Sequence, residues 1–306
     1  MIQRSPYEQS AQDPELLPSF VCYADILGYA QESRLALKSG SGNDYLKRLR
    51  RTLNTAYERV RRWGDFDAEI RAFDVKVFTD NIVVGYPIAD LGMTLGEPEL
   101  GHIFNIFIEL QVSLAMEGFF IRGGIAQGDH YMDDEIVFGD ALLEAVETDK
   151  SGGPPRLALT ARAIELVRGH LGFYGRPDSA PHYEDLLEDA DGTIFVNYLS
   201  AAFEAFPDAG VFFEIIEKHR DAVQDNLKRF RGSSGIRSKY EWAARYHNFV
   251  CSDFMERHPV PGNLDADDEY AAAAEDAQRL SEYLIDESEL AVSPQRISLS
   301  PLSRMR

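Results

Sequence analysis

The sequence predicts a two-layer α+β domain, in which helices cover an apolar sheet. Along residues 18–170 the patterns follow the order strand, helix, hairpin, helix, strand, helix, strand. The two long helical segments repeat apolar side chains every three or four residues. The strand segments are short runs rich in Val, Ile and Phe, bounded by turn residues.

A hairpin at residues 73–86, FDVKVFTDNIVVGY, stands at the centre of this order. Its apolar runs, 75–78 and 82–84, flank the polar link Thr79-Asp80-Asn81. Val, Ile and Phe favour a pleated surface, and Asp-Asn favours a tight reversal. The sequence therefore predicts that Asp80 stands at a rigid hairpin tip.

The other elements of the main domain follow from the same periodicities. A strand at 20–24 ends at Asp25, which Ile26, Leu27 and Gly28 follow. Amphipathic helices are expected over 44–63 and 102–117, and Gly118 ends the second. A strand then begins near residue 119. The later segments expected are a helix at 140–148, a strand at 156–159 and a helix at 160–168.

The chain is expected to have four parts. A flexible N-terminal arm (1–17) precedes a main domain (18–200), whose last section, 171–198, adds strands and loops. A helical region (201–290) holds helices at 203–230, 239–257 and 270–284. A Ser/Pro-rich tail (291–306) is expected to be disordered.

Composition excludes several classes of partner. Lys+Arg is 31 against Asp+Glu 51, a net charge of −20, which argues against nonspecific binding to nucleic acid or to anionic membranes. No apolar run approaches a membrane span, and the N-terminus has no signal-peptide pattern. Cys22 and Cys251 lie in apolar runs, as buried free thiols of a reducing compartment do. We therefore expect a cytoplasmic protein with no nucleic-acid or membrane partner.

Two aspartates at strand ends suggest a cation site. Asp25 ends the first strand and Asp80 lies at the hairpin tip, so their carboxylates can meet if the strands are neighbours. Hard divalent cations such as Mg²⁺ take oxygen ligands, often one or two carboxylates beside substrate phosphates. An Asp in a hairpin is more often only a turn residue, so neither aspartate is decisive alone.

Two further motifs complete a pattern. Arg122-Gly123-Gly124-Ile125-Ala126 and Ile136-Val137-Phe138-Gly139 follow the hairpin in the chain. With Asp25 and Asp80, in this order, the sequence resembles the class III nucleotidyl cyclases. The resemblance implies a ferredoxin-like βαββαβ core, with a mixed, mostly antiparallel sheet, helices on one face, and C-terminal helices added.

Within that family, the chain most resembles the pyrimidine cyclases of bacterial Pycsar antiphage systems. The stretches FTDN, RGGIAQGDHYMDDEIVFGDAL and KYEWAARYHN (239–248) carry this resemblance. It implies conversion of UTP, or of CTP, to a 3′,5′-cyclic nucleotide and pyrophosphate. The product would activate a separate effector protein on infection.

The resemblance also implies the parts of the site. Asp25 and Asp80 would be the catalytic aspartates that hold two divalent ions, Mn²⁺ or Mg²⁺, with the carbonyl of Ile26 as a further ligand. Gly28 would let the backbone approach the triphosphate. Lys76, four residues before Asp80, stands where purine-specific members place a base-reading lysine. A homodimer would share its sites, with Asp25 and Asp80 from one subunit and residues 122–147 from the other.

The sequence departs from the purine cyclases at three positions. Ile136, Leu143 and Glu147 stand where those enzymes carry a base-reading Asp, a ribose-positioning Asn and a transition-state Arg. Another basic group must then meet the phosphate charge. Arg122 is expected to bind substrate in this way, and Lys150 and Arg156 are the other candidates.

Three alternatives stay open. The chain could be a CTP cyclase, because no residue can be assigned to the edge that separates uracil from cytosine. It could be an ATP cyclase with a relaxed pocket, since Lys76 remains. It could also be a nucleotide-binding module that has lost catalysis, which the missing Asn and Arg favour. His247, on an apolar helix face, is interpreted as a packing residue.

Overall fold

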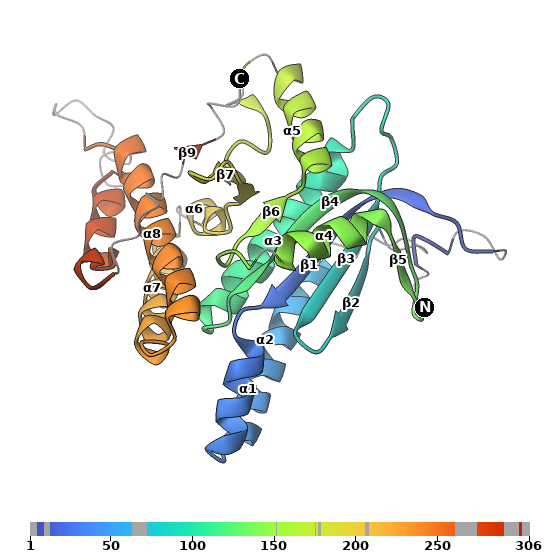
Figure 1. Ribbon diagram of the computed structural model, residues 1–306. Coiled ribbons are helices and arrows are strands. Elements are labelled where there is room, and N and C mark those ends of the chain that lie inside the picture. The colour runs from blue at the N-terminus through green and yellow to red at the C-terminus, as the bar shows by residue number, and fades with distance from the viewer. Residues whose placement is uncertain are drawn as a thin grey trace.

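The computed structural model describes residues 5–8, 13–62, 72–150, 152–174, 176, 179–205, 208–260, 274–290 and 300–301. It has an α+β architecture, with one mixed, mostly antiparallel sheet and helices packed on it (Figure 1). The expected class of fold is thereby confirmed. None of the helices in these ranges combines the length and the apolarity needed to cross a lipid bilayer.

The first half of the chain is a βαββαβ unit with one additional helix. In chain order its elements are β1 (Leu17–Ile26), α1 (Tyr29–Lys38), α2 (Gly42–Arg62), β2 (Asp74–Phe78), β3 (Asn81–Pro87), α3 (Glu97–Met116) and β4 (Ile121–Met132). The strands lie in the order β2-β3-β1-β4, and each neighbouring pair is antiparallel. The central position of β1 brings its end beside both the hairpin and β4.

The second half extends this sheet and adds helices. Its elements are β5 (Val137–Gly139), α4 (Asp140–Lys150), β6 (Leu157–Leu159), α5 (Ala161–Phe173), β7 (Leu186–Glu188), β8 (Ile194–Val196), α6 (Ser200–Glu204), α7 (Ala209–Arg229), α8 (Ser234–Arg257), the 3-10 turns η2 (Arg279–Tyr283) and η3 (Glu287–Glu289), and β9 (Ser300–Pro301). From β4 the sheet continues through β6, β8, β7 and β9, while β5 pairs with β4. The β4–β6 pair is parallel, because α4 crosses over between its two strands.

The two faces of the sheet carry different helices. Side chains alternate along β1, so Phe20 and Cys22 point into the main core with α2, α3 and α5. Val21 points to the opposite face and packs against α4. The expectation of helices on one face is therefore wrong for α4, which lies in front of the sheet in Figure 1 while α3 lies behind it. Helix α4 can pack on this face because Gly124 of β4 has no side chain. A Cβ at this position would lie only 2.8 Å from the carbonyl oxygen of Ala145 in α4.

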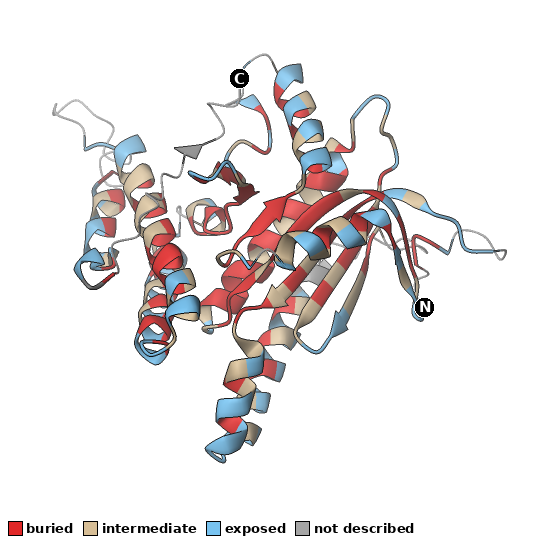
Figure 2. Cartoon of the chain, in the orientation of Figure 1, coloured by how far each residue is buried: buried red, intermediate tan, exposed pale blue. Residues whose placement is uncertain are grey.

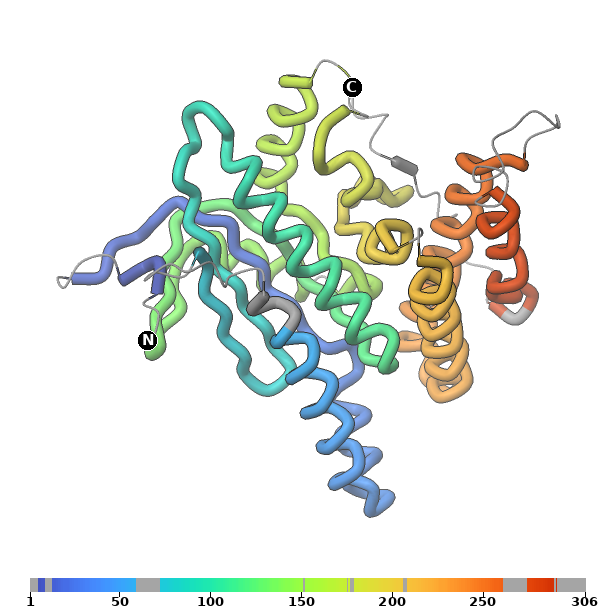
Figure 3. Tube along the Cα trace, turned by 180° about the vertical axis from the view of Figure 1, so that it is seen from behind, coloured from blue at the N-terminus to red at the C-terminus, as the bar shows by residue number. Residues whose placement is uncertain are grey.

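The C-terminal helices pack directly on the first unit. One buried cluster joins Val112 and Phe120 from the end of α3 and the start of β4 to Tyr240 and Tyr246 of α8. Figure 3 shows α7 beside the end of α3, from the side opposite to Figure 1. Cys251 of α8 is, like Cys22, a buried free thiol, as predicted. This packing brings α8 close to the end of β1.

A few described residues near each end of the chain contact the sheet, although the composition suggested loose segments there. Within the expected arm, the Ser5 hydroxyl donates to the Met132 carbonyl at 3.0 Å, and the Tyr7 hydroxyl donates to Ser19 Oγ at 3.1 Å. Within the expected tail, Ser300–Pro301 pair with β7. Residues 291–299 and 302–306 lie outside the described residues. The contacts of Ser5 and of Ser300–Pro301 use backbone groups of β4 and β7, which need hydrogen-bond partners.

Two helix boundaries also differ from the prediction. α3 begins at Glu97 rather than at His102, because Pro98 fits the first helical turn, where its missing N–H costs nothing. The segment expected as one helix over 203–230 forms α6 and α7. Asp208 caps α7 by accepting hydrogen bonds from the amides of Gly210 and Val211. Figure 2 shows the central strands as buried and the outer sides of α1, α4 and α5 as largely exposed.

Buried histidines make the fold sensitive to acid, among them His130 and His247. His130 on β4 and His247 on α8 are fully buried, and burial lowers the pKa of each to about 4. An unfolded histidine titrates near 6.5, so the unfolded chain takes up protons that the folded chain does not as the pH falls from about 7. We expect the free energy of unfolding to fall by about 2 kcal/mol per histidine between pH 7 and pH 5.

Urea unfolding at the two pH values checks this expectation. His247→Gln removes one such group and should lose less stability on acidification than the unmodified protein. His102→Gln, at a position that is not fully buried, should lose as much as the unmodified protein does. Equal pH dependence in the His247→Gln variant and the unmodified protein would contradict the prediction. Burial of His247 agrees with its interpretation as a packing residue.

Candidate functional site

The tip of the β2–β3 hairpin holds Asp80 beside the end of β1. The predicted hairpin is confirmed, with Thr79 and Asp80 as its two turn residues. Thr79 has a left-handed backbone (φ 57°), which β-branched residues rarely adopt. Its hydroxyl donates to the Asp80 carboxylate at 2.7 Å, and the Ile26 amide donates to the Asp80 carbonyl at 3.1 Å. These bonds fix a carboxylate against the end of β1.

The strand register places several of the predicted residues in one row across the sheet. Phe78 pairs with Asn81, Asn81 with Asp25, and Asp25 with Arg122. Directly paired residues share a face, so these four side chains lie on the face that α4 partly covers. Lys76 lies two residues before Phe78 on β2 and therefore on the same face.

Three carboxylates gather at this point, from Asp25, Asp80 and Asp149. Burial and a hydrogen bond with Asp80 raise the pKa of Asp25 to about 7, and the charges of Asp149 and Asp80 act in the same direction. Burial also raises the pKa of Asp149 above its usual range, and the charge of Asp80 adds to this. The cluster repels further negative charge and favours a cation.

Two basic side chains oppose the carboxylates. Arg122 Nη2 lies 3.3 Å from Asp25 Oδ2, and Arg122 Nε lies 3.0 Å from Asp149 Oδ1. The second contact is an ion pair without hydrogen-bond geometry, since neither atom makes a hydrogen bond to a described residue. Burial and the charge of Arg122 lower the pKa of Lys239, while Asp149 and Asp25 oppose that shift. Helix α8 thus brings a second positive charge to the site.

Tyr23 lies on the same face as Asp25, two residues before it on β1. Its hydroxyl donates a hydrogen bond to Asn81 Oδ1. Burial raises the pKa of Tyr23 to about 12, and the charges of Asp25, Asp149 and Asp80 contribute. Tyr23 therefore remains a neutral hydrogen-bond donor throughout the physiological range.

The donor atoms of this cluster fit a hard divalent cation. Asp25 and Asp80 are in hydrogen-bond contact, so both carboxylates can reach one ion. Oxygen donors without nitrogen or sulfur suit Mg²⁺ and Mn²⁺. Ile26 belongs to the same strand end and fixes Asp80 through its amide. The role of the Ile26 carbonyl as a ligand stays a prediction.

Gly28 is required by its backbone conformation. It has φ 78° and ψ 3° and is the N-cap residue of α1, a helix that begins without a side-chain cap. A side chain at this left-handed position would be strained. The first amide groups of a helix have no partner within the helix and attract anions. Gly28 thus places an anion-attracting helix terminus three residues after Asp25.

The charge of Lys76 acts on Asp133 in the β4–β5 turn. A hydrogen bond from the Ile136 amide lowers the pKa of Asp133, and the charge of Lys76 contributes to that shift. Lys76 is half-buried on β2. Its place on the row's face is compatible with the predicted contact to a base, which stays a prediction.

The structure separates the three basic candidates for the phosphate. Arg122 contacts Asp25, whereas Lys150 is exposed at the end of α4 and Arg156 binds Asp189 and Asp191. Among the described residues, the ion-pair partners of Arg156 are Asp189 and Asp191 rather than Asp25 or Asp149, so the structure favours Arg122 over Arg156.

Arg122 bears on the expected division of the site between subunits. It contacts Asp25 of its own chain, because β4 is the direct neighbour of β1. The expectation of a site shared between two subunits stays a prediction.

Arg156 has a structural role that can be tested. Its guanidinium donates to Asp189, while Trp242 Nε1 donates to the same carboxylate at 2.8 Å. Arg156→Met leaves Asp189 buried without its cation, so we expect a loss of about 3–5 kcal/mol in the free energy of unfolding, measured with urea. Arg162→Met removes a solvent-exposed pair with Asp140 and should have little effect. Similar losses in both variants would contradict the assignment.

Several residues of the site were missed by sequence reasoning. Asp149 lies two residues after Glu147, one of the positions examined for a catalytic side chain. Lys239 begins the stretch 239–248, which was noted only for its resemblance. Leu143 and Glu147, by contrast, are exposed on α4. The spacing along the chain carries no signal for Lys239, since only the packing of α8 brings it to the site.

Comparisons with known proteins add no family. No protein-family model matches the chain, and no curated protein matches it. The functional assignment therefore rests on the site and on the motif resemblance.

Proposed function

We propose that this protein is a metal-dependent class III nucleotide cyclase that converts UTP to 3′,5′-cyclic UMP and pyrophosphate. The observation that carries the proposal is the Asp25–Asp80 pair: Asp25 pairs with Asn81 at a strand end, and the Ile26 amide donates to the Asp80 carbonyl at the hairpin tip at 3.1 Å. They lie in a βαββαβ unit with strand order β2-β3-β1-β4. That order supports the ferredoxin-like core that the motif resemblance implies.

Asp25 and Asp80 are the residues that would hold two divalent ions, Mg²⁺ or Mn²⁺, with the Ile26 carbonyl. Bound there, the ions would polarise the α-phosphate and make the 3′-hydroxyl of the ribose easier to deprotonate. The raised pKa of Asp25, which burial and its contact with Asp80 cause, supports this placement. A cation would remove the repulsion that these carboxylates now experience.

The remaining groups would orient the triphosphate and oppose its charge. The reaction forms a bond from the ribose 3′-oxygen to the α-phosphorus and breaks the bond to the β-phosphate, so that pyrophosphate leaves and the hydroxyl proton passes to water. The start of α1 after Gly28 would bind phosphate oxygens. Arg122 and Lys239 would stabilise the negative charge that develops on the phosphate oxygens.

The choice of base rests on the resemblance and on one departure. Ile136 replaces the Asp that reads a purine, which disfavours ATP and GTP. Lys76 would approach the base from the sheet face of the row. CTP is the alternative substrate, and ATP is a further one because Lys76 is retained. The product would act as a cytoplasmic second messenger on a separate effector in antiphage defence.

A homodimer forms part of the proposal. Large apolar side chains are exposed on β2, β5 and α4: Phe78 is 77% exposed, Phe138 64% and Leu143 65%. Phe78 belongs to the row that contains Asp25. Apolar groups at the rim of a polar site favour burial by a partner. A second copy of the chain would cover them, and light scattering on the purified protein would then give twice the mass of the chain.

The test is an incubation of the purified protein with ATP, GTP, CTP or UTP and Mn²⁺, with products identified by mass spectrometry. Cyclic UMP is the expected product. Cyclic CMP or cyclic AMP would support the proposed reaction but would show that the substrate is CTP or ATP. No product from any of the four, in a folded protein that binds UTP, would overturn catalysis. It would favour the second candidate, a nucleotide-binding module, which the absence of Asn at 143 and of Arg at 147 supports.

A further inference from the structure

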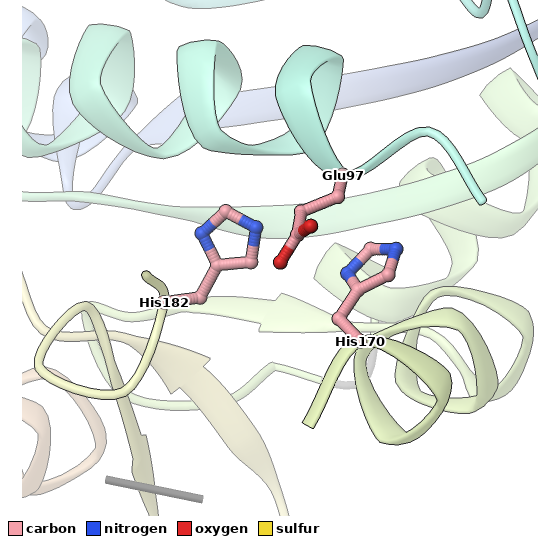
Figure 4. Close-up of side chains that lie close together, drawn as sticks. All are labelled: Glu97, His170 and His182. Carbon is pink, nitrogen blue, oxygen red and sulfur yellow. The ribbon is translucent and has the colours of Figure 1, made fainter. Parts of the chain in front are cut away.

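A second polar cluster lies at the other end of α3 from Asp25. Glu97 begins α3, His170 is in the last turn of α5, and His182 lies in the connection from α5 to β7. One ligand atom from each residue lies within 4.8 Å of the other two. Figure 4 shows the Glu97 carboxylate between the two imidazole rings.

Each of these side chains has a buried polar atom with no hydrogen bond. Glu97 Oε1, His170 Nδ1 and His182 Nε2 are all inaccessible to solvent and lack a hydrogen-bond partner among the described residues. Both histidines are buried. An unpaired buried polar group is costly, and most such groups in proteins are satisfied. Three of them that converge in one cluster could all be satisfied by one bound ligand.

The opposite polar atoms of Glu97 and His170 are hydrogen-bonded from outside the cluster, and that of His182 lies near a carboxylate. Tyr174 Oη donates to Glu97 Oε2 at 3.2 Å, and His170 Nε2 lies 3.0 Å from the Leu95 carbonyl. His182 Nδ1 lies 3.9 Å from the Asp185 carboxylate. A carbonyl or carboxylate on the far ring nitrogen is the usual support of a metal-binding histidine, because it leaves the near nitrogen free of its proton.

We infer that Glu97, His170 and His182 form a binding site for a divalent transition-metal ion, for which Zn²⁺ fits best. Two imidazoles and one carboxylate suit Zn²⁺ and disfavour Mg²⁺ and Ca²⁺, which prefer oxygen donors alone. Tetrahedral ligands about 2.1 Å from the ion lie about 3.4 Å apart, so the three side chains draw together on binding. The fourth position is left for water.

The ion has a structural role in this position. It joins the start of α3 to the end of α5 and to the chain that leads into β7, so it ties the sheet extension to the first unit. The site does not depend on the proposed cyclase activity. The cluster lies at the first turn of α3, a 20-residue helix about 30 Å long. The last turn of α3 precedes β4, which carries Arg122, so the two sites lie at opposite ends of this helix.

The test measures metal bound to the full chain. Asp25→Asn/Asp80→Asn removes the all-oxygen site, and this variant serves as the background. After gel filtration in metal-free buffer, elemental analysis should find one Zn²⁺ per chain in the background. His170→Gln and His182→Gln should lose that ion, whereas His102→Gln, a histidine of α3 outside the cluster, should keep it. Zn²⁺ retained in both cluster variants would overturn the inference.

A second measurement does not depend on the folding of the cluster variants. The background protein is stripped with a chelator, checked by circular dichroism and titrated with Co²⁺. A visible absorption band that saturates at one equivalent, and is displaced by Zn²⁺, is the expected result. Chelation should also lower the melting temperature. A folded, stripped protein that gives no Co²⁺ absorption and melts as before would overturn the site.

Discussion

Replacing Asp80 by Asn should reduce cyclic nucleotide formation by about 10³-fold or more, with the fold retained. An amide has the size of the carboxylate and can still accept the Thr79 hydrogen bond that fixes the hairpin tip. It cannot supply the negative charge that a divalent ion needs. The loss should therefore appear in the chemical step and in Mn²⁺ affinity, measured by turnover at increasing metal concentration.

Asp25→Asn should lose as much activity and should also change stability in a way that depends on pH. Burial and Asp80 raise the pKa of Asp25 to about 7, from an unfolded value of 3.8. The folded state therefore holds this proton more tightly than the unfolded state. The stability that the protonated Asp25 contributes is lost as the pH rises from about 4 through 7. In chelator at pH 8 the Asn variant should melt above the unmodified protein, and near pH 4 the difference should vanish.

The matched control for both variants is Asp134→Asn, an exposed aspartate in the β4–β5 turn. It removes the same charge from a turn outside the row and should leave turnover unchanged. If a folded Asp80→Asn protein retains turnover, Asp80 has no role in the reaction. Loss of activity in Asp134→Asn as well would point to net charge rather than to the site.

The local patterns predicted most of what positions Asp25 and Asp80. A strand of Val, Ile and Phe and a two-residue reversal are decided within a few residues, so β1 and the hairpin lie where the sequence indicated. The pairing of β1 with β3, which the sequence left as a condition, brings the Asp25 and Asp80 carboxylates together. These parts of the site depend on short-range physics and on one strand pairing.

The missed parts depend on tertiary packing. Asp149 enters the site because Gly124 and Ala126 on β4 let α4 lie flat on the sheet face, a pattern visible in the sequence but interpreted only as a motif. Arg156 was a candidate because its partner, Asp189, is 33 residues away and no pattern links the two. Glu97, His170 and His182 have no metal-site spacing, and only the packing of α5 on α3 reveals them.

Lys239→Met should reduce turnover by about 10²-fold, mostly through kcat. Methionine keeps most of the aliphatic stem that reaches the site and removes the charge that faces Asp25 and Asp149. If α8 supplies a group for the transition state, the affinity for UTP should change less than the rate. Lys228→Met, an exposed lysine of α7 that pairs with Asp225, is the matched control and should leave both constants unchanged.

The pH dependence of turnover in Lys239 variants shows whether Lys239 acts through its charge or only through packing. Burial and the positive charge of Arg122 lower the pKa of Lys239, so it loses its proton at a lower pH than an ordinary lysine. Turnover should fall as the pH rises toward that pKa. Lys239→Arg keeps its charge at every accessible pH, so it should recover activity and retain it at higher pH. If Lys239→Met and Lys239→Arg are equally impaired with unchanged pH profiles, α8 only covers the site, and Arg122 is left as the positive charge identified beside Asp25.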